Sequence, residues 1–143
     1  MTPQRAQTWL KGASIAVIGF GLLILGAAHP ATGGLTVFFT DLIIWPLDGG
    51  QSLALTEQRL LAAILGGVMA GWGVILYGLA TALTEAPDAI RKLILMSIGT
   101  WFVLDSLGSV ISGAPLNVLG NLGFLALFAV PLMRMQASSP AAA

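Results

Sequence analysis

The stretch "QRLLAAILGGVMAGWGVILYGLATAL", residues 58–83, contains a single charged side chain, that of Arg59. A helix of about 20 mostly apolar residues is long enough to cross the hydrocarbon core of a bilayer. A stretch of this length and composition therefore predicts a transmembrane helix.

The whole chain has the same character. Of its 143 residues, 57% are hydrophobic and 8% are charged, and its mean hydropathy is +0.92. A soluble domain carries roughly a quarter charged residues, so most of this surface is expected to face lipid. The net charge is zero, which gives no indication of nucleic acid as a partner. With no cysteine and one histidine, the chain has no thiolate chemistry and no histidine-rich metal site, and no cofactor is predicted.

Three further apolar stretches match the first, at about residues 9–28, 90–111 and 115–133. The link "SGAP" at 112–115 is so short that the last two stretches must form an antiparallel pair. We therefore predict an all-α integral membrane protein, a four-helix bundle with four transmembrane helices. A secretory signal is the alternative for the first stretch, although its apolar part exceeds the usual 7–15 residues.

The connection between the first two spans is unusually apolar. Residues 35–47, "LTVFFTDLIIWPL", place apolar side chains at helical spacing but are too few to cross a bilayer. We expect a helix that lies in the membrane interface, with a re-entrant segment as the alternative. Residues 1–135 would form one transmembrane domain, and 136–143 a disordered tail.

The basic residues predict the direction of the chain. Cytoplasmic loops carry the Lys/Arg excess in bacterial membrane proteins. With four spans, only Arg59 falls on the opposite side from the other basic residues, which are Arg5, Lys11, Arg91, Lys92 and Arg134. The sequence therefore predicts a multi-pass protein of the bacterial cytoplasmic (inner) membrane with both termini in the cytoplasm.

The stretch "TWFVLDSLGS", residues 100–109, places Asp105 inside the third span. A charged side chain near the bilayer centre costs a few kcal/mol, so Asp105 should point between helices, hydrogen-bonded or protonated. A rise of about 1.5 Å per residue puts Asn121 at the depth of Asp105, and Asn117 at the depth of Ser109. We expect an intramembrane polar cluster in the outer half of the bundle, made of Asp105, Ser109, Ser112, Asn117 and Asn121.

Two other sets of residues have predicted positions. A solvated outer rim is expected, in which Arg59 meets a rim carboxylate or lipid headgroups rather than Asp105; the rim residues are His29, Asp41, Asp48, Glu57 and Arg59. Small residues at GxxxG spacing let helix backbones approach each other. The second span should pack through such a ridge, formed by Ala63, Gly67 and Gly71.

The function is constrained mainly by what the sequence lacks. It contains no nucleophile–base pair, P-loop or H-E-x-x-H motif. The leading interpretation is a non-catalytic accessory or assembly subunit, or a small homo-oligomer, with lipid and a protein partner or second copy around it. A transporter or channel is the alternative, with Asp105 as the proton- or substrate-coupling carboxyl in an outward cavity. A membrane enzyme acting on a lipid or quinone through Asp105 and His29 comes third. For Asp105 and Asn121 themselves the leading interpretation is a structural one, hydrogen bonds between helices worth about 1 kcal/mol or less each. A proton- or ligand-handling role and contact with a partner subunit are the alternatives.

Overall fold

The computed structural model describes residues 1–135, and every regular element within them is helical. Three helices are long and apolar enough to cross a membrane, namely α1 (Pro3–Leu25), α3 (Thr56–Ala82) and α4 (Pro87–Ile111), whereas α5 (Asn117–Met133) has 17 residues. The predicted disordered tail, 136–143, lies outside the described residues. The elements are α1 (Pro3–Leu25), the short 3-10 helix η1 (Gly26–Ala28), α2 (Gly34–Ile43), α3 (Thr56–Ala82), α4 (Pro87–Ile111) and α5 (Asn117–Met133).

Two helix boundaries differ by more than three residues from the apolar stretches that predict them. Helix α1 begins at Pro3 rather than near residue 9, because the Thr2 side chain accepts a hydrogen bond from the Arg5 amide and Pro3 suits the first helical position. Helix α2 ends at Ile43 rather than near residue 47. Pro46 cannot continue a helix and disfavours helical backbone in the residue before it. Local backbone chemistry therefore sets both ends.

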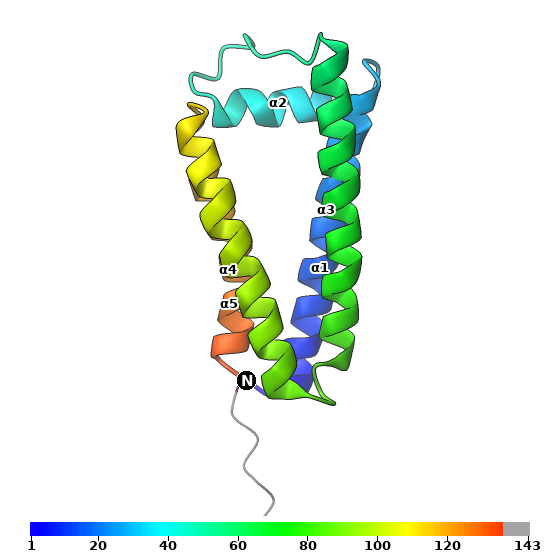
Figure 1. Ribbon diagram of the computed structural model, residues 1–143, viewed down its shortest axis with the longest axis vertical. Helices are drawn as coiled ribbons and strands as arrows, with labels where there is room; N and C mark the ends of the chain where they lie inside the picture. The colour runs from blue at the N-terminus through cyan, green and yellow to red at the C-terminus, as the bar shows by residue number, and fades with distance from the viewer. Residues whose placement is uncertain (136–143) are drawn as a thin grey trace, which may run out of the picture.

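The four longest helices, α1, α3, α4 and α5, form two antiparallel pairs (Figure 1). Helices α1 and α3 make the most extensive contact, followed by α4 and α5. The two pairs meet at the end that holds the N-terminus and separate towards the other end, where α2 lies across the bundle (Figure 1). We call these the closed end and the open end.

The α1–α3 pair is held by direct contact between backbones. A Cβ atom added at Gly66 would lie 2.5 Å from the carbonyl oxygen of Gly21, and one added at Gly21 would lie 2.6 Å from the amide nitrogen of Ala70. At Gly73 an added Cβ would lie 3.0 Å from the amide nitrogen of Ile18. No side chain fits at these positions, so glycine allows the close approach.

The prediction that α3 packs through Ala63, Gly67 and Gly71 is wrong by one residue, because Gly66 rather than Gly67 contacts α1. Gly67 and Gly71 are exposed, and nothing lies within 4 Å of a Cβ added at either; Ala63 is only partly buried. Glycines at both 66 and 67 give α3 two small-residue ridges on neighbouring faces. Spacing alone cannot say which ridge faces α1.

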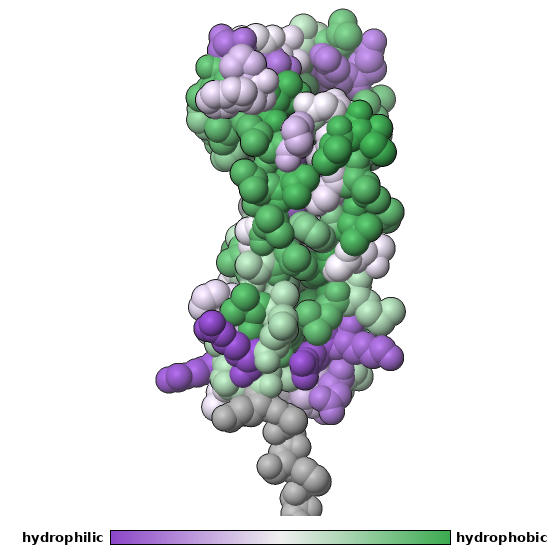
Figure 2. Space-filling model, turned by 90° about the vertical axis from the view of Figure 1, so that its left-hand side faces the viewer, coloured by the Kyte–Doolittle hydropathy of each residue, from purple (hydrophilic) through white to green (hydrophobic). Residues whose placement is uncertain are grey.

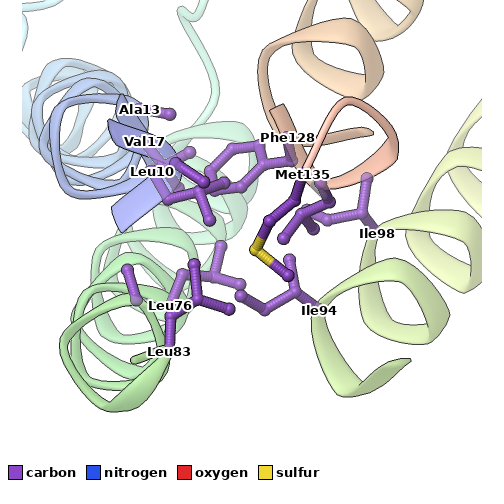
Figure 3. Close-up of a cluster of buried hydrophobic side chains, with 12 residues drawn as sticks. Leu10, Ala13, Val17, Leu76, Leu83, Ile94, Ile98, Phe128 and Met135 are labelled. Carbon is purple, nitrogen blue, oxygen red and sulfur yellow. The ribbon is translucent and has the colours of Figure 1, made fainter. Parts of the chain in front are cut away.

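The closed end holds the apolar core, where all four long helices contribute side chains (Figure 3). Because lipid is as apolar as these side chains, close packing rather than water exclusion stabilises such a core. The fully buried members include Leu10, Val17, Leu76, Leu83, Ile94, Ile98, Phe128 and Leu132.

Two indole hydrogen bonds connect the helix pairs. Trp9 Nε1 donates to the carbonyl oxygen of Leu127 at 2.9 Å, joining α1 to α5. Trp72 Nε1 donates to Ser97 Oγ at 3.1 Å, joining α3 to α4. The pairs are therefore fastened to each other by polar contacts as well as by the core.

The surface agrees with a membrane protein. Figure 2 shows hydrophobic residues over the middle of one face, with hydrophilic residues gathered towards the two ends. Exposed leucine, isoleucine and valine side chains occur along α3 and α4. The chain is thus a helical protein whose long helices are suited to lipid surroundings.

The glycine contacts generate a paired prediction. Gly66→Ala should lower the free energy of unfolding by about 1–3 kcal/mol, because the added methyl group overlaps the α1 backbone. Gly67→Ala, one residue away on an exposed face, should leave it unchanged or raise it slightly, since alanine favours helix more than glycine does. Reversible unfolding in mixed detergent–lipid micelles measures both. Equal stability of the two variants would contradict the packing described for α3.

Candidate functional site

A tight turn brings the polar residues of α4 and α5 together. Gly113 has a φ of +84°, a backbone conformation that glycine adopts readily. The Ala114 amide then donates to the carbonyl oxygen of Ser109 at 2.8 Å, which closes the end of α4. Helix α5 runs back along α4, so its first two turns lie beside the segment that contains Asp105.

Two asparagines of α5 bind one carboxylate oxygen of α4. Asn121 Nδ2 donates to Asp105 Oδ2 at 2.6 Å and to Ser106 Oγ at 3.2 Å. Asn117 Nδ2 donates to the same Oδ2 at 3.2 Å and to Ser109 Oγ at 2.9 Å. We call these five residues the Asp105 network.

The structure therefore brings together four of the five residues expected to cluster, leaving out Ser112. Ser112 is exposed and donates only to the backbone carbonyl of Ser109, at 3.1 Å. Ser106 was missed because it follows Asp105 directly and falls outside the i, i+4 stripe. Asn121 Nδ2 donates to both Asp105 and Ser106, which brings the Ser106 hydroxyl into the network.

The network is polar but has no cation. Asn121 is 4% exposed and Ser109 is buried, whereas Asp105 is partly buried. Both amide donors bind Oδ2 of Asp105, and no residue in the described part of the chain donates a hydrogen bond to Oδ1. Within residues 1–135, one carboxylate oxygen of Asp105 thus has no hydrogen-bond donor.

A cavity of about 810 Å³ lies beside the network, in the space where the two helix pairs separate. Its walls come from α1, α3, α4 and α5, and α2 contributes residues including Phe39 and Thr40. Asp105, Asn117 and Asn121 all line it. Small-molecule sites have volumes of about 300–1,000 Å³, mainly apolar walls and a few polar groups. This cavity has that composition.

Aromatic side chains form part of the cavity wall next to the carboxylate. The Phe20 ring centroid lies 5.7 Å from those of Phe39 and Phe124. The Trp101 ring lies 6.2 Å from Phe124 and 5.7 Å from Trp72. Since Trp101 is one helical turn from Asp105, the wall carries π-faces and an anionic group close together.

Arg59 and His29 of the predicted outer rim take part in local backbone contacts. Arg59 donates from its guanidinium to the carbonyl oxygens of Leu53 and Ala54, and to Thr56 Oγ1 at 3.2 Å. His29 Nδ1 accepts a hydrogen bond from the Ala31 amide at 3.2 Å. Both side chains therefore stabilise chain turns at the open end.

The acidic rim residues behave differently from one another. Asp48 Oδ1 accepts from the Gly50 amide at 2.9 Å, and Glu57 is exposed in the first turn of α3, where a helix favours negative charge. Asp41 was expected on a solvated rim, but it is 5% exposed, which corrects that prediction. The loop after α2 folds back so that the Gly49 amide donates to Asp41 Oδ2 at 2.9 Å. Its Oδ1 has no hydrogen-bond partner within residues 1–135.

Comparison with known proteins gives no relatives for this chain. It matches no protein-family model, and no curated protein or solved structure is significantly similar to it. Over residues 1–135, no three His, Asp or Glu side chains lie close enough to share a metal ion.

Removing one amide of the network should weaken the α4–α5 pair. Asn121→Ala loses two hydrogen bonds, one of them to a carboxylate. The expected loss is about 1–2 kcal/mol of unfolding free energy. Ser112→Ala, whose hydroxyl bonds only within its own turn, is the control and should change stability by less than about 0.5 kcal/mol. Unfolding in bicelles measures the difference, and equal effects would show that the network does not hold the pair.

Proposed function

We propose that this protein is a non-catalytic, four-pass membrane protein that takes an amphipathic molecule into its cavity, as a small transporter or carrier with Asp105 as the substrate-coupling carboxyl. One observation carries the proposal: a carboxylate with a free oxygen lines a mainly apolar cavity of about 810 Å³. A purely structural role for the Asp105 network would require its hydrogen bonds but not a cavity beside them.

Helix α5 would be the fourth span. Its 17 residues rise about 25 Å at 1.5 Å per residue. The turn before it adds three i→i+3 hydrogen bonds, from the amides of 117–119 to the carbonyls of 114–116. At about 2 Å per residue this tighter helix contributes about 6 Å. The sum is close to the roughly 30 Å of a hydrocarbon core.

The charges support cytoplasmic termini in a bacterial inner membrane. The closed end holds the beginnings of α1 and α4 and the end of α5 (Figure 1), and with them most of the basic residues. Only Arg59 lies at the open end. By the positive-inside rule the closed end faces the cytoplasm, and the open end, with α2 as an interfacial helix, faces the periplasm.

An accessory or assembly subunit is the second candidate. Gly67 and Gly71 form an exposed GxxxG pair with nothing within 4 Å of an added Cβ. Such a pair allows another helix to approach closely. The partner would be a membrane protein or a second copy of this chain.

The orientation can be tested with single cysteines, because the natural chain has none. Ser52→Cys, in the exposed loop before α3, should react with a membrane-impermeant maleimide added to intact cells. Glu85→Cys, exposed in the link between α3 and α4, should react only after the cells are permeabilised. The reverse labelling pattern would contradict the proposed orientation.

Uptake into the cavity can be tested with N-phenyl-1-naphthylamine, a neutral apolar dye whose fluorescence rises in apolar surroundings. Gly120→Leu adds a side chain to a residue that lines the cavity. Gly123→Leu adds the same side chain on the same helix at an exposed position that does not line it. With protein held in amphipol, Gly120→Leu should weaken saturable dye binding several-fold, and Gly123→Leu should match the natural protein.

Each result bears on one of the two candidates. Equal dye binding by the two leucine variants, or no saturable binding by the natural protein, would overturn the cavity function. Recovery of the protein in a larger complex after mild detergent extraction would then favour the accessory function. Recovery as a monomer, with normal assembly of membrane complexes in a deletion strain, would count against that second candidate.

A further inference from the structure

We propose that the cavity selects molecules that join an apolar tail to an ammonium group, with Asp105 as the counter-ion. This inference rests on the proposed cavity function and names its ligand class. It follows from the charge of the cavity lining, from the free carboxylate oxygen and from the aromatic wall.

The hydrogen-bonding capacity of the network calls for a donor. Asn117 and Asn121 both donate to Oδ2 of Asp105, which leaves Oδ1 without a donor from the described chain. Two amides fix the orientation of the carboxylate, so its position is set before a ligand arrives. A group that fills the remaining site must offer N–H or O–H bonds, and an ammonium offers the strongest, charge-assisted kind.

The charge of the lining favours a cation over a neutral donor. Asp105 is the only acidic residue in the cavity lining, and that lining, drawn from residues 1–135, contains no lysine, arginine or histidine. Arg59, at the open end of the bundle, directs its guanidinium to backbone carbonyls of the adjacent loop. A carboxylate among apolar walls is costly without a partner of opposite charge. A bound ammonium supplies that charge, whereas a fatty acid would add a second negative one.

The aromatic wall supports the same ligand class. Phe20, Trp101 and Phe124 line the cavity together with Asp105, and adjacent rings lie 5.7–6.2 Å apart. Aromatic faces attract cations within about 6 Å of the ring. Most of the remaining wall residues, among them Leu65 and Met69, are apolar and suit an alkyl chain. The polar ones, all uncharged, are Thr36, Thr40, Gln58, Asn117 and Asn121.

Competition against N-phenyl-1-naphthylamine tests the ligand class with three probes of equal tail length: dodecylammonium, dodecanol and dodecanoate. The measured quantity is the ratio of the affinity for dodecylammonium to the affinity for dodecanol. This ratio should be about tenfold or more higher in the natural protein than in Asp105→Asn. Comparing this ratio between the proteins cancels the partition of each probe into amphipol. Asp48→Asn, which changes an exposed carboxylate outside the cavity lining, should keep the natural ratio. Dodecanoate should compete least.

The dye itself reports whether a variant keeps its cavity, so a misfolded Asp105→Asn is recognised by loss of dye binding. In that event Asp105→Glu, which keeps the charge, should retain the preference for ammonium. If the dye binds and the ratio is the same in the natural protein and Asp105→Asn, the ammonium assignment is wrong while the cavity function stands. If the natural protein does not bind the dye, both proposals fall.

Discussion

The backbone contact between α1 and α3 is the constraint on which the rest of the structure depends. Gly21, Gly66 and Gly73 leave no room for a Cβ between the two helices, so the two backbones are in direct contact there. The α4–α5 pair is held separately, by its short turn and by the Asp105 network. Because each helix pair is held by its own interactions, the two pairs can be in contact at one end and apart at the other. They meet at the closed end, where their apolar side chains pack together (Figure 3).

The open end follows from that arrangement. Beyond the core the pairs separate, and α2 lies across the space between them (Figure 1). The cavity is therefore a product of how the bundle is assembled. Its position also decides the environment of the Asp105 network, because the same asparagines that join α4 to α5 face the cavity. One set of side chains thus joins a helix pair and places the Asp105 carboxyl group at the cavity wall.

The hydrogen bonds of the network explain how a carboxylate is tolerated in so apolar a chain. Asp105 Oδ2 accepts two amide hydrogen bonds, which compensate part of the cost of removing the group from water. The other oxygen remains available. Asp41 shows a contrasting solution: it is buried under the loop that follows α2, binds the Gly49 amide and does not line the cavity. Of the two, only Asp105 lines the cavity.

The sequence by itself determined the helical, apolar character of the chain, the antiparallel turn between α4 and α5, and the shared depth of Asp105 and Asn121. These are one-dimensional properties, because depth along a helix follows from a fixed rise per residue. Only the tertiary structure decided that Gly66 rather than Gly67 faces α1, that Ser106 joins the network, that Asp41 is buried and that a cavity lies beside Asp105. Each of these depends on how a helix is rotated about its axis or on where a loop returns. The rotation of α4 about its axis could be predicted, because Asp105 has few polar residues within reach and must face them. The rotation of α3 could not, because α3 has glycine on two adjacent faces and only its packing against α1 decides between them.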